Sequence, residues 1–409
     1  NLFVWFEVML MSSYVLVLFY GDSEHTRAAL NYVVLNLIGS AVMLVAIGGL
    51  YATTGTLNMA DLARRLADPG VYDVHLLPVL GLSAVLFSVF ALKAGIVPFQ
   101  FWVPAAYRAA PTPVTAMLAG VVKKVGVYAI VRLYFTIFAA ASLPESLSIP
   151  GFDGTTTLAF FGPVLFVMAT ASVVFGGLGA IGRDDLDDVL AYSSISQIGF
   201  IVLPLAVAAT VPAVRTLGVI ACLVYTVNHG FAKSLLFLVS GTVAETVGTR
   251  EFAGLGGVAR RSPVLAGAFL IGALSLIGVP PLVGFFGKFL VFDVAVRALA
   301  LDAAGAAATI AVALFGAVLT IAYYTRAWNA VFWGEATGRV AVDRVAHDGG
   351  TARSTARTGQ VAVALALAVV IVAMGVGFEV VYTAAEAAAR AAVDTGGYVD
   401  AVAPAEVIE

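Results

Sequence analysis

The sequence predicts an all-α, polytopic membrane protein with inverted repeats. Its 409 residues are 61% hydrophobic and only 11% charged, whereas an ordinary globular domain is about 25% charged. Apolar runs of about twenty residues recur along the whole chain, and two of these runs are interrupted by proline. The runs are uniformly apolar rather than alternating, which favours helices over a β-barrel.

Ten membrane spans are expected. They cover approximately residues 1–20, 29–51, 78–108, 113–138, 158–182, 186–209, 214–240, 263–298, 303–333 and 359–382. Between the second and third spans, Thr56 to Leu66 reads as a short amphipathic helix lying in the membrane interface. The chain opens at Asn1, already inside an apolar span and without a basic leader. We therefore expect further helices to precede it.

The third span is interrupted by Pro98, which removes one helical hydrogen bond and clashes with the carbonyl of Ala94. The eighth span is interrupted by Pro280 and Pro281, which free the carbonyls of the two residues before Gly278. Freed backbone groups in a bilayer are tolerated only against protein or water. The two spans are five apart, and a five-helix repeat reverses its topology. Paired broken helices of this kind are typical of inverted-repeat transporters.

This symmetry predicts the domain organisation. Residues 1–138 would be the remainder of the first five-helix repeat, and 158–333 the second. Residues 334–358 would be a loop, and 359–409 a terminal helix with a tail along a surface. Ten arginines fall in the loops after odd-numbered spans and six on the other side. The positive-inside rule places the first set, and the loop, in the cytoplasm and the C-terminal tail outside.

All five lysines fall inside predicted spans: Lys93, Lys123, Lys124, Lys233 and Lys288. Insertion into a membrane costs about 2.5 to 3.5 kcal/mol per Lys. Arg stays charged, whereas a buried Lys can shift its pKa and exchange a proton. The placement therefore favours proton movement. The alternative, a genome that prefers Arg codons, explains scarce lysines in loops but not lysines where they cost most.

Glu7 lies in the middle of the first span and needs a partner, for which Lys93 is the natural candidate. Such a pair can be switched by a neighbouring charge. The alternative is a static ion pair that locks two helices.

Lys123 and Lys124 are adjacent, so on a helix they point about 100° apart. At most one of them is expected to face the same row of buried polar groups as Lys93. Lys123 is expected to snorkel or to face a partner subunit. His229 and Lys233 share one helix face, which favours a relay over a satisfied core histidine. The predicted proton-transfer residues, bridged by water, are Glu7, Lys93, Lys124, His229, Lys233 and Lys288.

Three other sequence patterns are better explained by structure than by function. The glycines from Gly177 to Gly182 match a dinucleotide-binding spacing but lie inside a span, so we expect them to pack helices. The acidic cluster from Asp184 to Asp188 suits a helix N-terminus, with a metal site as the alternative. The single cysteine, Cys222, excludes a disulfide framework. No metal or cofactor is expected.

Several motifs together resemble the shared core of antiporter-like membrane subunits, which occur in Mrp-type multisubunit Na+/H+ antiporters and in respiratory complex I. They are Lys93 to Val114, including Pro98-Phe99-Gln100-Phe101-Trp102, Lys123 to Tyr128, Ala191 to Gly199, Asn228 to Gly230 and Gly278 to Lys288. Within this superfamily the chain is most similar to the D subunits of Mrp-type antiporters. That similarity rests on Ala105-Ala106-Tyr107, on Trp328 with Phe332-Trp333-Gly334-Glu335, and on the tail Tyr398 to Val402.

The resemblance implies a fourteen-helix fold, so that about four helices precede this chain. It makes Glu7, Lys93, Lys124 and Lys288 the main proton-transfer residues. The sequence departs from the family pattern at Gln100, where His is frequent, and near Ala105 and Tyr107, where an acid and a His are frequent. These departures weaken a proton route through the second half of the third span.

The expected function is a proton-translocating subunit of a multisubunit Na+/proton antiporter in a prokaryotic cell membrane, working with other membrane subunits and without bond chemistry. Sodium prefers several oxygen ligands, whereas the buried groups here are mostly ammonium, so no sodium site is expected in this chain. The alternatives are a proton-pumping subunit of complex I or of a membrane-bound hydrogenase, and a non-transporting scaffold.

Overall fold

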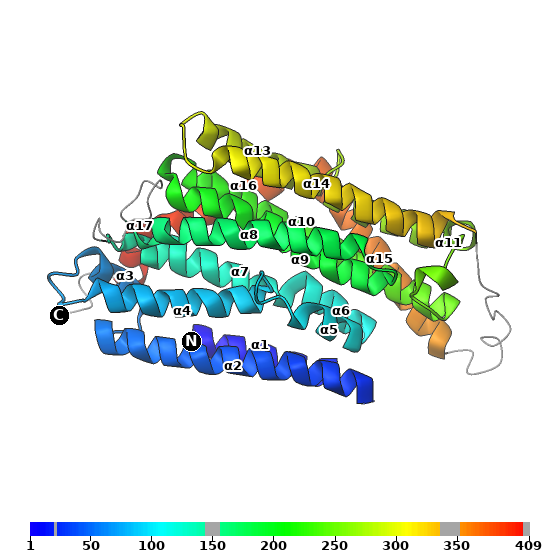
Figure 1. Ribbon diagram of the computed structural model, residues 1–409, viewed down its shortest axis with the longest axis horizontal. Coiled ribbons are helices and arrows are strands. Elements are labelled where there is room, and N and C mark those ends of the chain that lie inside the picture. Colours follow the sequence, from blue (N-terminus) through cyan, green and yellow to red (C-terminus); the bar gives the residue numbers. More distant parts are fainter. Residues whose placement is uncertain (20–22, 144–155, 336–351, 404–409) are drawn as a thin grey trace.

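The computed structural model describes residues 1–19, 23–143, 156–335 and 352–403. Over these ranges the chain is helical, and the long helices run roughly parallel to one another (Figure 1). Eight described helical segments are long and apolar enough to cross a membrane, and two shorter apolar helices accompany them. These ten segments correspond to the ten predicted spans, so the all-helical membrane architecture is confirmed.

The first part of the chain contains ten helical elements. They are α1 (Leu2–Val17), α2 (Ser23–Thr54), α3 (Met59–Ala67), α4 (Leu76–Ala94), α5 (Trp102–Ala109), α6 (Thr112–Met117), η1 (Leu118–Val122), α7 (Lys124–Ile130), η2 (Val131–Ile137) and η3 (Phe138–Ala140). Elements α6 to η3 form one continuous span, in which η1 and η2 are π-helical turns.

The remaining elements come after residues 144–155. They are α8 (Thr157–Ile181), α9 (Leu186–Thr210), η5 (Pro212–Val214), α10 (Arg215–Val247), η6 (Phe252–Gly254), α11 (Val258–Arg261), α12 (Pro263–Ile277), α13 (Val283–Leu299), α14 (Ala306–Trp328), η7 (Asn329–Trp333), α15 (Ala352–Val376), α16 (Phe378–Val393) and α17 (Thr395–Val402). In Figure 1, α1 and α2 lie along one edge of the bundle and α13 and α14 along the opposite edge.

Both predicted helix breaks are present. α4 ends before Gly95, which has φ +64°, and Pro98 follows within the irregular segment before α5. α12 ends before Gly278, which has φ +95°, and the prolines follow before α13. In each case a glycine in the left-handed region ends the first half-helix ahead of the proline, because glycine adopts this conformation without steric cost. The prolines predict the breaks, and the glycines set the residues at which they occur.

The centre of the bundle is α9, which packs most extensively against α8. A Cβ on Gly177 would lie 2.6 Å from Cδ1 of Leu319 on α14, and one on Gly179 would lie 2.4 Å from Cδ1 of Tyr192 on α9. The glycines of this stretch therefore let α9 and α14 approach α8 closely. This confirms the packing interpretation of the glycine spacing.

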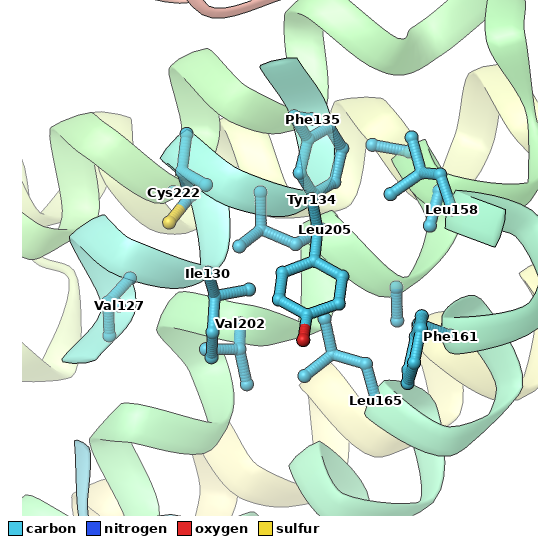
Figure 2. Close-up of a cluster of buried hydrophobic side chains, with 14 of the residues drawn as sticks. Val127, Ile130, Tyr134, Phe135, Leu158, Phe161, Leu165, Val202, Leu205 and Cys222 are labelled. Carbon is cyan, nitrogen blue, oxygen red and sulfur yellow. The ribbon is translucent and has the colours of Figure 1, made fainter. Parts of the chain in front are cut away.

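A large apolar cluster joins the first and second parts of the chain (Figure 2). Tyr134 of η2 lies among side chains of α8 and α9, including Phe161 and Leu205. Its ring centroid is 4.9 Å from that of Phe161, in an edge-to-face arrangement. Its hydroxyl donates to the carbonyl of Ser83 on α4. Because the contacts come from both parts of the chain, they fix the two parts against each other.

The predicted amphipathic helix is present as α3. Asn58 caps its N-terminus, and Asp61 pairs with Arg64 at 2.7 Å and with Arg65 at 2.9 Å. Burial alone would raise the pKa of Asp61, but hydrogen bonds from Thr56 and the two arginines lower it below the ordinary value of 3.8.

The C-terminal helices turn back onto the first part of the chain. Thr136 of η2 donates to the carbonyl of Ala392 at 2.7 Å, and Thr395 donates to the carbonyl of Thr136 at 2.7 Å. The Arg132 guanidinium lies 4.1 Å from the ring centroid of Tyr398. The predicted tail is therefore a packed pair of helices. Most of the predicted loop at 334–358 lies outside the described residues.

Candidate functional site

All five lysines are buried, with at most 8% of any of them exposed. Among the described residues none of them forms a salt bridge with a carboxylate. Each instead donates to a backbone carbonyl, a hydroxyl or both. These acceptors are neutral, so a lysine can lose its proton without leaving a buried anion behind.

Lys93, in the last turn of α4, faces α2. Its Nζ donates to Oγ of Ser40 at 2.9 Å and to the carbonyl of Asn36 at 3.3 Å. Glu7 on α1 has one carboxylate oxygen, Oε1, that is buried without a hydrogen-bond partner in the described part of the chain. The two groups interact electrostatically, but the structure shows no direct ion pair between them. A static ion pair between Glu7 and Lys93, which would hold α1 and α4 together, is therefore not formed.

Lys123 and Lys124 are both buried, contrary to the expectation that Lys123 would snorkel or face a partner. Nζ of Lys123 donates to the carbonyl of Ser194 on α9 at 2.9 Å, while Nζ of Lys124 donates to the carbonyl of Ala119. The two side chains still point to different neighbours, and both are buried because this span packs between α4, α9 and α10. The outward face of this span is marked instead by Val121, which is 61% exposed.

His229 lies fully buried in α10, and neither ring nitrogen has a hydrogen-bond partner among the residues that the structure describes. The described side chains therefore do not supply the hydrogen bonds of a satisfied core histidine. Lys123, Lys124 and Lys233 all act on it electrostatically. A neutral imidazole has one donor and one acceptor nitrogen, so among three lysines it can accept a proton on one side and donate on the other.

Lys233, one turn along α10, has the largest set of acceptors of the five lysines. Its Nζ donates to the carbonyl of Leu190 at 2.9 Å, to the hydroxyl of Ser193, and to the hydroxyl of Tyr324 at 3.2 Å. Two of these acceptors belong to α9 and one to α14, so Lys233 joins three central helices.

Lys288 lies just beyond the second helix break. Its Nζ donates to the carbonyl of Ile277 at 3.2 Å and lies 4.7 Å from the ring centroid of Phe200. Ile277 carries one of the two carbonyls that the prolines are predicted to free. The break therefore supplies the acceptor for the lysine next to it.

A polar network that the sequence did not predict links α9, α10 and α14. Oε1 of Gln197 accepts from the hydroxyl of Tyr225, and Nε2 donates to Tyr323 at 2.7 Å and to Thr320 at 3.1 Å. All four side chains are buried. The spacing of Ser193 and Gln197, one turn apart in an apolar helix, was the available signal.

An open cavity of about 1200 Å³ lies where α9 begins and α10 ends. It is lined by charged side chains that include Arg27, Arg108, Arg183, Arg250, Asp184, Asp185, Asp187, Asp188, Glu245 and Glu251. These four arginines come from loops that the positive-inside rule assigns to one side, and they do lie together at one end of the bundle.

The acidic cluster does more than complement a helix dipole. Asp187 accepts from Ser240 at 2.5 Å and pairs with Arg250 at 2.9 Å, while Asp188 pairs with Arg108. Asp185 caps α9. In the part of the chain that the structure describes, no three His, Cys, Asp or Glu side chains are arranged to hold a metal ion.

Comparison with known proteins gives consistent relatives. The D subunit of the Na+/H+ antiporter of Alkalihalophilus pseudofirmus is 35% identical over 336 residues, which are 82% of this chain and 62% of the relative. The N subunit of the NADH-quinone oxidoreductase of Desulforudis audaxviator is 35% identical over 328 residues, 80% of this chain and 59% of the relative. This chain therefore spans about three fifths of the length of these curated relatives.

A solved structure supports the same fold. The structure of the Mrp complex from Dietzia sp. DQ12-45-1b contains a chain that superposes with a TM-score of 0.80 at 29% identity, over 98% of this chain and 75% of that chain. The family model described as NADH:quinone oxidoreductase/Mrp antiporter, transmembrane, matches residues 1–320. This chain belongs to the NADH:quinone oxidoreductase/Mrp antiporter transmembrane family.

Proposed function

We propose that this chain is the proton-translocating membrane subunit of a multisubunit monovalent cation (Na+)/proton antiporter. The observation that carries the proposal is the set of five buried lysines that donate to neutral acceptors. A purely structural role would favour lysines paired with carboxylates, because an unpaired buried charge is costly. The relatives named as D subunits of Na+/H+ antiporters favour the same class of function.

The proton path would use the six predicted groups, Glu7, Lys93, Lys124, His229, Lys233 and Lys288. Lys123 joins them, since it is buried next to the first helix break: a Cβ on Gly95 would lie 3.6 Å from its Nζ. The breaks at Pro98 and at Pro280 and Pro281 would provide backbone acceptors within the membrane. Water would bridge the gaps between groups.

The predicted repeats, residues 1–138 and 158–333, would place one broken helix in each half. The open charged cavity would be the cytoplasmic entrance, because its arginines come from the side with more positive charge. The C-terminal helices α16 and α17 would then lie outside a prokaryotic plasma membrane. Partner membrane subunits would complete the antiporter, and sodium would be handled by the complex rather than by an oxygen-rich site in this chain.

A second candidate is a redox-driven pump subunit, as in respiratory complex I or a membrane-bound hydrogenase. The relative from an NADH-quinone oxidoreductase favours it. A chain at 28% identity in the structure of the membrane-bound sulfane sulfur reductase, which covers 98% of this chain with a TM-score of 0.76, favours it too. The proton path would be the same in both cases, and the source of energy would differ.

Inverted membrane vesicles that carry the whole complex distinguish these functions. Proton flux is followed with a pH-sensitive dye after addition of Na+ and, separately, of NADH. The proposal expects flux with Na+, without flavin or iron–sulfur subunits in the purified complex. Flux with NADH alone would favour the redox pump. Co-purification of normal partners with no flux under either condition would favour a scaffold.

A further inference from the structure

The Tyr225 hydroxyl lies within hydrogen-bond distance of two acceptors but has one proton. It contacts Oε1 of Gln197, and it lies 3.5 Å from the carbonyl of Leu276. A phenol can donate to one acceptor at a time. The structure directs the Tyr225 proton at Gln197 of α9, and the Leu276 carbonyl at the second helix break is the alternative acceptor within reach.

The orientation of the Gln197 amide follows from its other neighbours. Thr320 donates its own proton to the carbonyl of Gly316 at 2.7 Å, so toward Gln197 it can only accept. The amide nitrogen must then face Thr320 and Tyr323, and the amide oxygen must face Tyr225. Gln197 thus offers Tyr225 an acceptor that competes with the helix break.

The second acceptor of Tyr225 is next to the lysine of the break. Leu276 and Ile277 are consecutive, and the carbonyl of Ile277 accepts from Lys288. The helix that carries Lys288 also packs directly on Tyr225, since a Cβ on Gly287 would lie 2.6 Å from its Cδ2 atom. A proton donated to the Leu276 carbonyl reduces the negative potential that the end of α12 offers to the Lys288 ammonium.

We propose that Gln197 is a positioning residue that sets which acceptor the Tyr225 hydroxyl uses, and thereby how readily Lys288 releases its proton. This inference rests on the proposed function, in which Lys288 exchanges protons. With Gln197 present, the Tyr225 hydroxyl donates to Gln197 on α9, and the carbonyls at the second helix break interact with Lys288 alone of the two side chains. When Tyr225 turns to Leu276, the ammonium of Lys288 loses stabilisation and its proton leaves more readily.

Other titratable groups lie on the helices around Lys288. Three helices packed against α13 carry buried titratable side chains: Cys222, Tyr225, His229 and Lys233 of α10, Asp187 and Asp188 of α9, and Tyr323 and Tyr324 of α14. On α13 itself, Asp293 pairs with Arg297. Of these, Tyr225 contacts the carbonyl adjacent to the one that Lys288 uses. It is therefore the group through which α9 reaches the break.

The test is the pH dependence of Na+-driven proton flux in vesicles that carry the whole complex. Gln197→Met has a similar size and no acceptor, so Tyr225 turns to Leu276. The pH of half-maximal flux is expected to fall by about 0.5 to 1 unit, a three- to tenfold change in proton affinity. In the Tyr225→Phe background the same substitution should add no shift, because Gln197 acts through Tyr225. Ser196→Ala is the matched control, because Ser196 lies next to Gln197 on the same helix but its hydroxyl donates to the carbonyl of Val173 and to neither Gln197 nor Tyr225.

Equal shifts from Gln197→Met with and without Tyr225 would overturn the inference, as would no shift in the single variant. Infrared spectroscopy of the purified complex with ring-labelled tyrosine gives a second measurement that needs neither flux nor the Gln197 variant. A phenol band that moves between two positions with pH, and is lost in Tyr225→Phe, is expected. A single fixed band would contradict the switch. Absent Na+-driven flux in the wild type would refute the proposed function, while the infrared result would still decide the switch.

Discussion

Removing one acceptor from Lys233 should shift the pH dependence of transport. In Ser193→Ala the ammonium keeps two of its three acceptors, the carbonyl of Leu190 and the hydroxyl of Tyr324. A hydrogen bond to a charged group contributes about 1.5 to 3 kcal/mol, and one pH unit corresponds to about 1.4 kcal/mol. The loss affects the charged form, so the pH of half-maximal flux should fall by about one to two units.

The assay is Na+-driven proton flux in inverted vesicles between neutral and alkaline pH, at equal amounts of assembled complex. Ser196→Ala is the matched control, because Ser196 is equally buried on the same helix and donates to the carbonyl of Val173 at 3.1 Å. It should leave the midpoint unchanged. A midpoint that does not move in Ser193→Ala, or that moves equally in both variants, would refute the role of Lys233 as a titrating group.

Three further predictions concern stability and are followed by thermal unfolding of the purified complex. Gly126→Ala should lower the free energy of unfolding by about 1 to 3 kcal/mol, because a Cβ there would lie 2.6 Å from backbone atoms of α4. Gly81→Ala is the control and should not destabilise the protein, because the space around Gly81 is open. Arg250→Met should lower the free energy of unfolding by about 3 kcal/mol, because it leaves buried Asp187 without its cation. Adding Asp187→Asn to the same chain should restore most of that loss. If the double variant does not recover stability, the pairing is contradicted. The pKa of Asp61 is lowered in the folded chain, so its stabilising contribution is present above pH 3.8 and is lost as the pH falls below it. Asp61→Asn should therefore lose less stability than the wild type on acidification. Identical acid sensitivity of the two proteins would contradict this contribution of Asp61.

Much of the fold could be predicted because membrane helices are specified by composition and length. Each expected span has a helical counterpart, and both proline-containing breaks are present. The burial of Lys93, Lys124, Lys233 and Lys288 was also predictable, since charge in an apolar run is conspicuous. The glycines that end α4 and α12 could not be singled out among 41 glycines, because a positive φ leaves no pattern in the sequence.

The predictions failed where they depended on side-chain direction. Lys123 was expected to leave the interior because adjacent residues on a helix diverge, but neighbouring helices cover this span on several sides, so both directions lead to buried positions. The pairing of Glu7 with Lys93 was expected from charge alone, whereas Ser40 and Asn36 supply nearer neutral acceptors. The Gln197 network depends on three helices meeting, which periodicity within one helix does not reveal.

The proposed function requires that the buried lysines carry protons rather than merely hold helices together. Lys93→Arg tests it most directly, because Arg keeps the positive charge and hydrogen-bond donors but does not release its proton. The measurement is Na+-driven proton flux in inverted vesicles at equal complex assembly, alongside Lys93→Ala. Both variants are expected to assemble and to lose flux. Wild-type flux in Lys93→Arg would show that charge alone suffices and would contradict proton transfer through Lys93.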